Sequence, residues 1–374
     1  MLNIMNEILI VTPYFRPAKL GGGSQISIEN LVDALSTDFK VTVVCLNRDF
    51  GQNEILTNSY IRVENNIKIL YWSNFNFYKI LKHFFKSNFK KIYINSFFSP
   101  LCIFLQIIYK KNKNIIISPK GEFFESAISN KKFKKHCAIF LIKFIFKKRT
   151  FHATSNHEVA SIVKYFPNNK IIVANDIPIS IDNITFHQSR TTKTDIFRII
   201  FSSRIVRNKN LIFLPKILKH LTSKIEFDIY GDIYDLKYYN EVEKELNKLP
   251  NNITWNYCGR LDFNDAQIIF SKYDLFVFPT LGENFGFVIL ESLSCGCPIL
   301  LSNNTTPWNE LEKNGVGYNL DLNNDKIWAD KIKYYIALSC NEKVKISSLC
   351  KDYAQQKTNI KKIINENLQM FKSN

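Results

Sequence analysis

The sequence predicts an α/β protein with two Rossmann-like domains, each built around a parallel sheet. Its 374 residues exceed what one hydrophobic core usually serves, and a hydrophobic content of 46% is ample for two cores. Short apolar segments alternate with helical segments, which is typical of parallel sheets. Twice, near Glu7 and near Ile196, an apolar strand is followed by a loop and a helix. We therefore expect one domain to begin at each of these strands.

The first domain opens with a strand at residues 7–12 and a loop that contains three consecutive glycines. A helix is expected over residues 26–35, with Ser24 as a candidate N-cap. The loop lacks the G-x-G-x-x-G spacing, so a dinucleotide fingerprint is absent. Glycines allow a ligand close to the backbone, but a flexible surface loop explains the run equally well. Four more strands are expected at residues 40–46, 67–71, 91–95 and 114–118.

The remainder of the first domain contains a lysine-bearing loop, a basic helix and two strands. Lys120 lies in P-K-G-E-F, directly after a strand, where open α/β sheets place their ligands. Residues 131–149 predict a helix with basic ends and an apolar middle. This pattern fits a core-facing helix with solvated lysines or a membrane-surface element. Strands are expected at residues 151–155 and 171–176, with a helix capped near Asn156 between them.

The second domain opens with a strand at residues 196–202. Arg204 and Lys209 lie between this strand and a helix expected to begin near Asn210, a position that favours phosphate binding. Strands at residues 225–231 and 253–261 follow, each with a glycine near its end, and residues 315–318 predict a further short strand. From residue 325 onward the pattern is helical.

Two glutamates mark the stretch around which the chain is organised. A strand at residues 274–279 is stopped by proline and glycine, and a helix opens at F-G-F and ends before Gly296 and Pro298. Glu283 lies in the turn, and Glu291 follows eight residues later. Unpaired amides at a helix start bind phosphate, and carboxylates accept hydrogen bonds from hydroxyls, so the arrangement suits a nucleotide sugar. Two acidic residues placed by chance near a helix start are the alternative.

This stretch resembles the Glu-x7-Glu region of the retaining glycosyltransferases of family 4. The matching residues are E-N-F-G-F-V-I-L-E, followed by S-C-G-C-P and P-W-N-E-L. The resemblance implies the GT-B fold, with two Rossmann-like domains whose parallel sheets face an interdomain cleft. It places an acceptor-side domain at 1–178, a linker at 179–195 and a nucleotide-sugar-binding domain at 196–355. Residues 356–374 are expected to form a helix that packs back on the first domain.

The resemblance also implies roles for individual residues. Glu283 would contact the transferred sugar and Glu291 the ribose. Arg204 and Lys209, which match R-x4-K, would neutralise the diphosphate, so the implied catalytic residues are Glu283, Arg204 and Lys209. The implied donor-binding residues are Gly22, Gly23, Arg204, Lys209, Arg260, Glu283, Asn284, Phe285, Gly286, Phe287 and Glu291. Many relatives have histidine where this chain has Lys120, which leaves Lys120 as a candidate acceptor or donor contact. No Asp-x-Asp occurs, so we expect no metal ion and no cofactor.

The charge of the chain is concentrated in one segment. Of a net charge of +17, residues 75–149 hold +15, from sixteen Lys and one Arg against two Glu. A protein that wraps nucleic acid would spread its charge more widely, so we expect no nucleic acid partner. An anionic membrane surface fits this segment better. We therefore expect a peripheral protein on the cytoplasmic face of the cell membrane. Because the family that the chain resembles commonly glycosylates lipid-linked acceptors, the resemblance implies a glycan or lipid-diphosphate-linked acceptor, in O-antigen or capsule assembly.

The cysteines and apolar runs give supporting expectations. Eight cysteines without a CxxC spacing predict reduced core thiols rather than a metal site. Glu7 interrupts the N-terminal apolar run, so no secretory signal is expected, and the longest apolar runs are too short to cross a bilayer.

Two other functions remain open at this point. A nucleotide-sugar epimerase of the related two-domain fold would bind the same ligand, but it needs positioned acid and base groups, and the six His form no obvious set. A basic module that binds nucleic acid or membrane without catalysis would be revealed by strong DNA affinity with a steep salt dependence.

Overall fold

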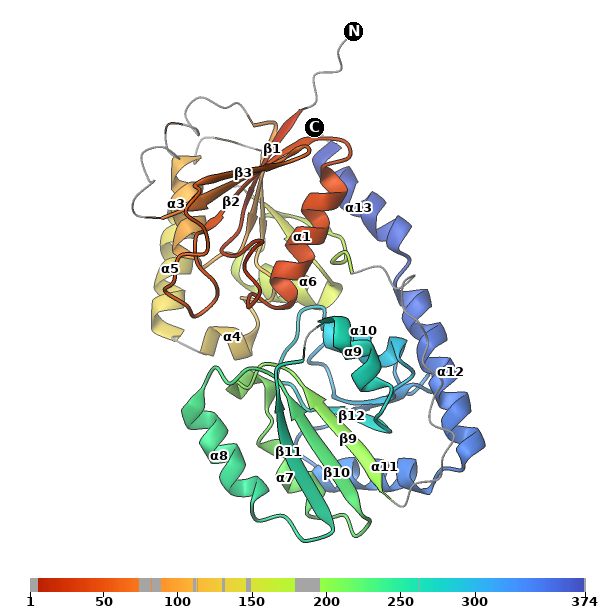
Figure 1. Ribbon diagram of the computed structural model, residues 1–374. Helices are drawn as coiled ribbons and strands as arrows, with labels where there is room; N and C mark the ends of the chain where they lie inside the picture. The colour runs from red at the N-terminus through yellow and green to blue at the C-terminus, as the bar shows by residue number, and fades with distance from the viewer. Residues whose placement is uncertain are drawn as a thin grey trace. The chain divides into compact units, whose positions relative to one another are not determined.

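The computed structural model describes residues 6–73, 82, 89–109, 112, 114–129, 132–145, 149–178, 196–261 and 263–372. The chain divides into two compact units (Figure 1). Unit 1 contains Met1–Ile179 and Ile360–Asn374, and unit 2 contains Ser180–Asn359. The expected linker at 179–195 lies outside the described residues. Each unit is described by itself below.

Unit 1 is built on an eight-stranded sheet within its described residues, in the order β3-β4-β2-β1-β5-β6-β7-β8. Only β3 is antiparallel to its neighbour; the other pairs are parallel. β1 and β5 are buried over nearly their whole length, which is why they are continuous apolar runs. The strands are β1 (Glu7–Val11), β2 (Lys40–Leu46), β3 (Ile61–Glu64), β4 (Ile67–Trp72), β5 (Lys91–Asn95), β6 (Ile115–Ser118), β7 (Thr150–Ala153) and β8 (Lys170–Val173).

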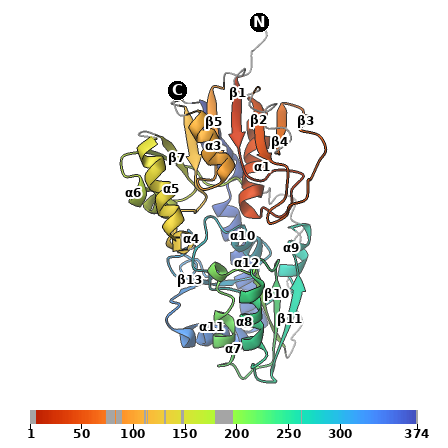
Figure 2. The ribbon, with the colours of Figure 1, turned by 90° about the vertical axis from the view of Figure 1, so that its left-hand side faces the viewer.

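Helices cover both faces of this sheet (Figure 2). One core joins the sheet to α3 (Pro100–Ile108), α5 (Lys132–Ile145) and α6 (Asn156–Tyr165), and α4 (Glu125–Ser129) contacts α5. A second core joins it to α1 (Gly23–Leu35) and α13 (Ile360–Lys372). Phe371 of α13 is fully buried, with its ring centroid 5.7 Å from that of Tyr93. The segment that belongs to unit 1 thus starts at Ile360, four residues after the expected boundary at 356.

Unit 2 is built on a six-stranded parallel sheet in the order β11-β10-β9-β12-β13-β14. Helix α7 contacts α8 and α11, and helix α10 contacts α9 and α12. The strands are β9 (Phe197–Ser202), β10 (Ile225–Tyr230), β11 (Ile253–Gly259), β12 (Leu275–Phe278), β13 (Ile299–Ser302) and β14 (Gly317–Leu320). The helices are α7 (Phe213–Leu218), α8 (Leu236–Leu246), α9 (Phe263–Phe270), α10 (Phe287–Ser294), α11 (Asp325–Ala337) and α12 (Cys340–Lys357).

Two expected helix starts were wrong. α1 begins at Gly23 with Gly22 as its N-cap, so Ser24 lies inside the helix. No helix begins at Asn210; a 3₁₀ helix at Arg207–Lys209 precedes it, Asn210 takes a left-handed conformation with φ 56°, and α7 starts at Phe213. At both of these starts the loop folds against other segments, and local sequence does not encode that packing. The cap expected near Asn156 is the adjacent Ser155, which accepts a hydrogen bond from the backbone N–H of Glu158, so this expectation is confirmed.

The cysteines follow the expectation only in part. All eight are free thiols, and five are buried, as core thiols should be. The other three, Cys137, Cys258 and Cys340, are exposed, so the prediction that they lie in the core was wrong. No described helix is both long and apolar enough to cross a membrane.

Candidate active site

The site in unit 2 lies where the strand order of the sheet reverses. β9 lies between β10 and β12, and the loops that leave β9 and β12 at their carboxyl ends lie next to each other. In open parallel sheets this is where ligands bind, because the two loops part to opposite faces and leave a crevice between them. Lys209 comes from the first loop and Glu283 from the second.

Lys209 and Glu283 are in direct contact. The Nζ of Lys209 forms an ion pair with Oε2 of Glu283. The Lys209 side chain is only 7% exposed and that of Glu283 is 21% exposed. Lys209 Nζ also lies 5.8 Å from the centroid of the Phe278 ring at the end of β12. A nearly buried cation beside a carboxylate is thus held at the point where the two loops meet.

Backbone hydrogen bonds fix the turn that carries Glu283. The N–H of Leu281 donates to the carbonyl of Asn208 at 2.8 Å, which joins the two loops. The N–H of Glu283 donates to the carbonyl of Thr305 at 2.9 Å, which ties the turn to the loop after β13. These bonds link the loops that follow β9, β12 and β13, so the packing of all three loops sets the position of Glu283.

Gly286 is required at the start of α10. Its backbone is left-handed, with φ 78°, and a Cβ there would lie 2.7 Å from Cδ1 of Ile289 and 3.0 Å from Cγ of Glu283. Both the conformation and the space exclude a side chain. No side chain caps the start of α10. An anion at this helix start would therefore not have to displace a side-chain cap, and the anion contact expected for Asn284–Phe287 stays a prediction.

Arg204 and Arg260 lie on the neighbouring loops, beyond β9 and β11. The guanidinium carbon of Arg204 is 5.8 Å from the centroid of the Tyr234 ring, and Nη1 of Arg260 is 3.9 Å from Oδ2 of Asp232. The N–H of Ile205 donates to the carbonyl of Asp232 at 2.9 Å, which joins the loops after β9 and β10. The three predicted cations of unit 2, on Arg204, Lys209 and Arg260, therefore all lie at the carboxyl ends of the strands.

Glu291 lies on the second turn of α10, because the helix begins at Phe287 rather than at residue 285. Its side chain is half-buried, and burial raises the pKa of its carboxyl to about 7. Burial therefore favours the protonated form of this carboxyl more than water does.

Comparison with known proteins identifies the activity. Residues 182–357 match the family model described as glycosyl transferases group 1. The chain is a glycosyltransferase with the GT-B fold. A Klebsiella pneumoniae protein, described as an uncharacterized 41.2 kDa protein in the cps region, is 24% identical over 311 residues, which are 79% of this chain and 82% of that protein.

Solved glycosyltransferase structures resemble the whole chain. Sucrose-phosphate synthase from Thermosynechococcus elongatus gives a TM-score of 0.74 at 14% identity, covering 98% of each chain. HepE from Anabaena, solved with UDP and glucose, gives a TM-score of 0.73 at 15% identity, covering 99% of this chain and 100% of that one. WaaG, a glycosyltransferase involved in lipopolysaccharide biosynthesis, gives 0.68 at 11% identity, covering 98% and 100%.

The raised pKa of Glu291 gives the glycosyltransferase a testable pH dependence. If Glu291 contacts the ribose, as the resemblance implies, its ionised carboxylate can accept hydrogen bonds from two hydroxyls, whereas protonation removes part of that capacity and should weaken donor binding. We expect the KM for the donor to rise as pH falls through about 7, the pKa of the free enzyme. Glu291→Gln should flatten this dependence, measured as kcat/KM for the donor between about pH 5 and 9. An unchanged profile in Glu291→Gln would contradict the assignment.

The same pKa also affects folding stability. The pKa of Glu291 in the folded protein lies above its ordinary value of 4.5. Protonation of Glu291 therefore stabilises the folded state. This stabilisation is fully present below the ordinary pKa of the carboxyl, and it is lost as the pH rises through about 7. A donor that binds the ionised form should restore the lost stability at alkaline pH.

Three predicted residues of the glycosyltransferase belong to unit 1. Gly22 is the N-cap of α1, with a left-handed φ of 66°, and Gly23 is the first residue of that helix. The loop before them is held by Gln25, whose Oε1 accepts a hydrogen bond from the N–H of Gly21 at 2.9 Å. This start of α1 also has no side-chain cap and no acidic residue in its first turn. An anion near Gly22 and Gly23 would meet unpaired amides.

Lys120 is the third of these residues, and its predicted role as an acceptor or donor contact stays a prediction. Its ammonium is buried, forms an ion pair with Asp176 and donates to Oγ of Ser27 at 3.0 Å. Burial lowers the pKa of Lys120, but Asp176, Tyr93 and Glu158 together raise it more, which favours the charged lysine. The structure therefore gives Lys120 a place inside unit 1, joining the loop after β6 to the end of β8.

Sequence reasoning missed two residues that organise these loops. Glu158 accepts hydrogen bonds from the N–H of Gly121 at 2.6 Å and from the N–H of Thr154 at 2.8 Å, so it holds the loop that carries Lys120. In unit 2, Nε1 of Trp308 donates to the carbonyl of Phe285 at 2.6 Å and fixes the approach to α10. Each could have been suspected from its motif, T-S-x-x-E or P-W-N-E-L, but neither motif names the partner.

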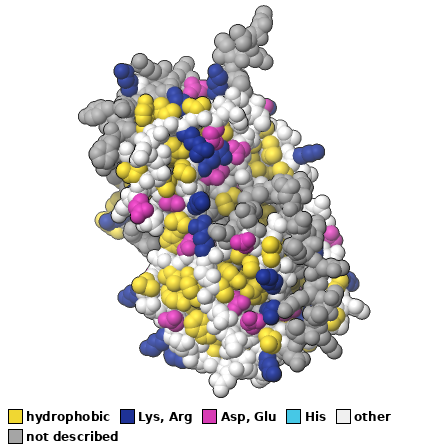
Figure 3. All heavy atoms as spheres, in the orientation of Figure 1, with side chains coloured by type: hydrophobic (Ala, Val, Ile, Leu, Met, Phe, Trp, Pro, Cys, Tyr) yellow, Lys and Arg dark blue, Asp and Glu magenta, His cyan; other side chains and the backbone are white. Residues whose placement is uncertain are grey.

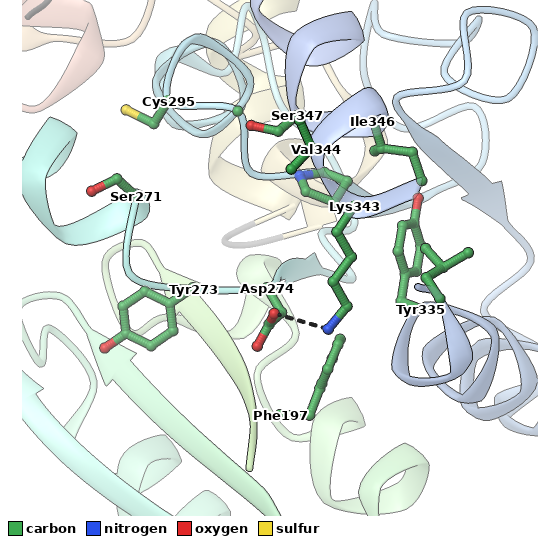
Figure 4. Close-up of a pocket in the computed structure, with 13 residues that line it drawn as sticks. Phe197, Ser271, Tyr273, Asp274, Cys295, Tyr335, Lys343, Val344, Ile346 and Ser347 are labelled. Carbon is green, nitrogen blue, oxygen red and sulfur yellow. Dashed lines mark hydrogen bonds and ion pairs between the residues drawn. The ribbon is translucent and has the colours of Figure 1, made fainter. Parts of the chain in front are cut away.

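A separate small cavity of about 60 Å³ lies at the other end of the unit 2 strands, where their amino ends are (Figure 4). Its lining includes Phe197 at the start of β9 and Asp274 just before β12. Lys343 of α12 reaches in, with its Nζ 3.3 Å from Oδ1 of Asp274 and 5.2 Å from the centroid of the Phe197 ring. Because it lies at the amino ends of the strands, this cavity is not part of the candidate active site. Among the described residues, no group of three His, Cys, Asp or Glu could hold a metal ion.

Proposed function

We propose that this glycosyltransferase moves a sugar from a UDP- or GDP-sugar, with retention of anomeric configuration and without a metal ion. The acceptor would be a glycan or a lipid-diphosphate-linked sugar in the assembly of a surface polysaccharide such as O-antigen or capsule. The observation that carries the proposal is the contact between Lys209 and Glu283 beside the uncapped start of α10. A cation next to a carboxylate suits a ligand in which a diphosphate adjoins sugar hydroxyls.

The chemistry follows from where charge develops. When the bond between the sugar and the diphosphate breaks, negative charge accumulates on the departing phosphate oxygens. Lys209, Arg204 and the first amides of α10 would stabilise that charge, while Glu283 would orient the hydroxyls of the transferred sugar. The nearly buried position of Lys209 strengthens its effect, because little water screens its charge.

The similar proteins support the setting of the reaction. The Klebsiella relative is described as lying in the cps region, and WaaG is described as acting in lipopolysaccharide biosynthesis. HepE was solved with UDP-glucose, which makes a UDP-sugar the first donor to test.

A thermal-shift screen with UDP-, GDP- and other nucleotide sugars tests the donor class, because a ligand that binds only the folded state raises its melting temperature. We expect one nucleotide class to raise the melting temperature of the wild type more than that of Lys209→Ala. The anomeric configuration of the product, read by NMR, then tests retention. Absence of a shift with every nucleotide sugar, or an inverted product, would contradict the proposal.

We also propose that unit 1 binds the cytoplasmic face of an anionic membrane through α5. The basic segment at 75–149 is described only in part: residues 75–81, 83–88, 110, 111, 113, 130, 131 and 146–148 lie outside the described residues. Within α5, Phe133 is 82% exposed and Phe140 is 70% exposed. They are seven residues apart, on one face of the helix, with Lys134 and Lys143 also exposed. Exposed aromatic rings flanked by lysines suit an interface with anionic lipid.

Removing the two rings should weaken membrane binding. Burying a Phe side chain contributes about 1.5–3 kcal/mol, so Phe133→Ala with Phe140→Ala should reduce the membrane-bound fraction strongly in liposome flotation. Leu236→Ala in unit 2, which removes a side chain that is 65% exposed, is the matched control and should change nothing. Binding that ignores both lipid charge and the loss of the two rings would leave a soluble acceptor as the better interpretation.

A further inference from the structure

The edge strand β11 is longer than the other edge strands and, unlike two of them, carries no charged residue. Among the described residues it pairs only with β10, and it extends over the seven residues Ile253–Gly259. No charged residue occurs from 250 to 259. The other edge strands, β3, β8 and β14, have four residues each, and two of them carry charges, at Arg62, Glu64 and Lys170. Proteins normally protect an edge by shortness or charge, so β11 lacks the usual protection against pairing.

The outer side of β11 is accessible. Thr254, Asn256, Tyr257 and Cys258 are exposed, and Trp255 is half-buried. Figure 3 shows apolar side chains gathered over α8 and β11 on the face in view. A bulge interrupts the ladder with β10 near the end of the strand, so the regular part runs from 253 to 257.

The hydrogen-bond pattern of β11 leaves one set of backbone groups facing outward. The carbonyl of Asn252 accepts from the N–H of Ile225 in β10, at 2.9 Å. Because the backbone groups of successive residues alternate in direction, those of Trp255 and Tyr257 face away from β10. These two residues therefore present two N–H groups and two carbonyls to a further strand.

We propose that β11 pairs with β11 of a second copy of this chain, antiparallel about a twofold axis at Asn256. In this register Trp255 of each copy faces Tyr257 of the other, so the outward backbone groups of both residues find partners. The same register forms two identical Trp–Tyr cross-strand pairs, and aromatic pairs stabilise antiparallel strands. The two six-stranded sheets would then form one continuous sheet.

A second copy fits this edge because the edge is complementary to itself. A twofold interface joins the same surface of both subunits, and Trp255 and Tyr257 are placed symmetrically about Asn256. Two chains that each carry +17 repel one another wherever lysines face lysines, and β11 offers contact without a charged residue on the strand. Asn256 is held in place by a hydrogen bond from its Nδ2 to Oδ1 of Asp228, at 2.8 Å.

Molar mass in solution tests the proposal. Light scattering on the full chain should give twice 43.7 kDa. Asn256→Lys places two like charges directly opposite each other at the axis and should give the monomer mass with an unchanged circular dichroism spectrum. Val173→Lys, at an exposed residue of the edge strand β8, is the matched control and should stay dimeric. A wild type that is monomeric up to its solubility limit, or an Asn256→Lys variant that stays dimeric, would overturn the proposal.

Cross-linking tests the register itself. Asn256 would sit opposite its own copy in a non-hydrogen-bonded pair, with Cα atoms about 4.5 Å apart. That spacing lies within the range of about 4.4–6.8 Å that a disulfide tolerates. In a Cys258→Ser background, Asn256→Cys should form a covalent dimer under mild oxidation. The Cys258→Ser parent, which keeps the exposed Cys137 and Cys340, is the control. Equal cross-linking in parent and variant would exclude this register.

Discussion

Lys209→Ala is expected to lower kcat by about 100- to 1,000-fold, the effect typical of removing one group that stabilises charge in a transition state. Lys209 is nearly buried and lies directly beside Glu283, so it would be a fixed cation at the departing diphosphate. Its ammonium is already in place before the reaction, and little water screens its charge. Initial rates at saturating donor measure the effect.

A neighbouring arginine provides the control. Arg207 lies in the same 3₁₀ helix, but it faces α8, where its Nη2 is 2.7 Å from Oε1 of Glu241. Arg207→Ala should therefore keep near wild-type activity. Since Lys209→Ala leaves Glu283 without its ion-pair partner, the melting temperature of each variant should be compared with its rate. Full activity in both Lys209→Ala and Arg204→Ala, or an absolute need for a divalent metal, would show that the proposed mechanism is wrong.

Glu283→Ala is expected to depress kcat more than Glu291→Ala does. A contact to the transferred sugar changes the geometry of the reacting centre, so its loss is felt in the transition state. A contact to the ribose is made equally in the bound donor and in the transition state, so its loss mainly raises KM. We expect a fall in kcat of about 100-fold for Glu283→Ala and a rise in donor KM of about 10-fold for Glu291→Ala, on the scale of one or two lost charge-assisted hydrogen bonds.

An exposed carboxylate in the same unit serves as the control for both glutamates. Glu310 is 53% exposed and pairs with Lys357 at 3.7 Å on the surface. Glu310→Ala should leave both kinetic constants unchanged. If both glutamate variants changed only the donor KM, and by the same factor, the separate roles of the two carboxylates would be refuted.

The fold follows largely from the apolar pattern of the sequence. Parallel strands such as β1 and β5 are covered on both faces, so they must be continuous runs of apolar residues, and such runs can be recognised without a structure. β3 was missed because it is a short edge strand, with Arg62 and Glu64 among its four residues. An edge strand has only half its surface covered, so its sequence resembles that of a loop.

Lys120 shows where a motif stops being informative. It lies after a strand and before a glycine, as ligand-binding residues often do, and the neighbouring residues alone are enough to recognise this position. Its partner Asp176 lies 56 residues later in the chain. Nothing near Lys120 in the sequence indicates that a carboxylate will be buried beside it, so the ion pair with Asp176 is known only from the structure.

The sequence by itself determined the two Rossmann-like units, through its alternation of apolar strands and helices, and it indicated the activity through the resemblance of the Glu283–Glu291 stretch to family 4. The tertiary structure alone decided what those residues can do. Lys209 meets Glu283 across 74 residues of sequence only because β9 and β12 are neighbours in the sheet. Burial around α10 sets the protonation of Glu291. Contacts between distant segments and the exclusion of water depend on how the whole unit packs, and no local pattern of residues encodes them.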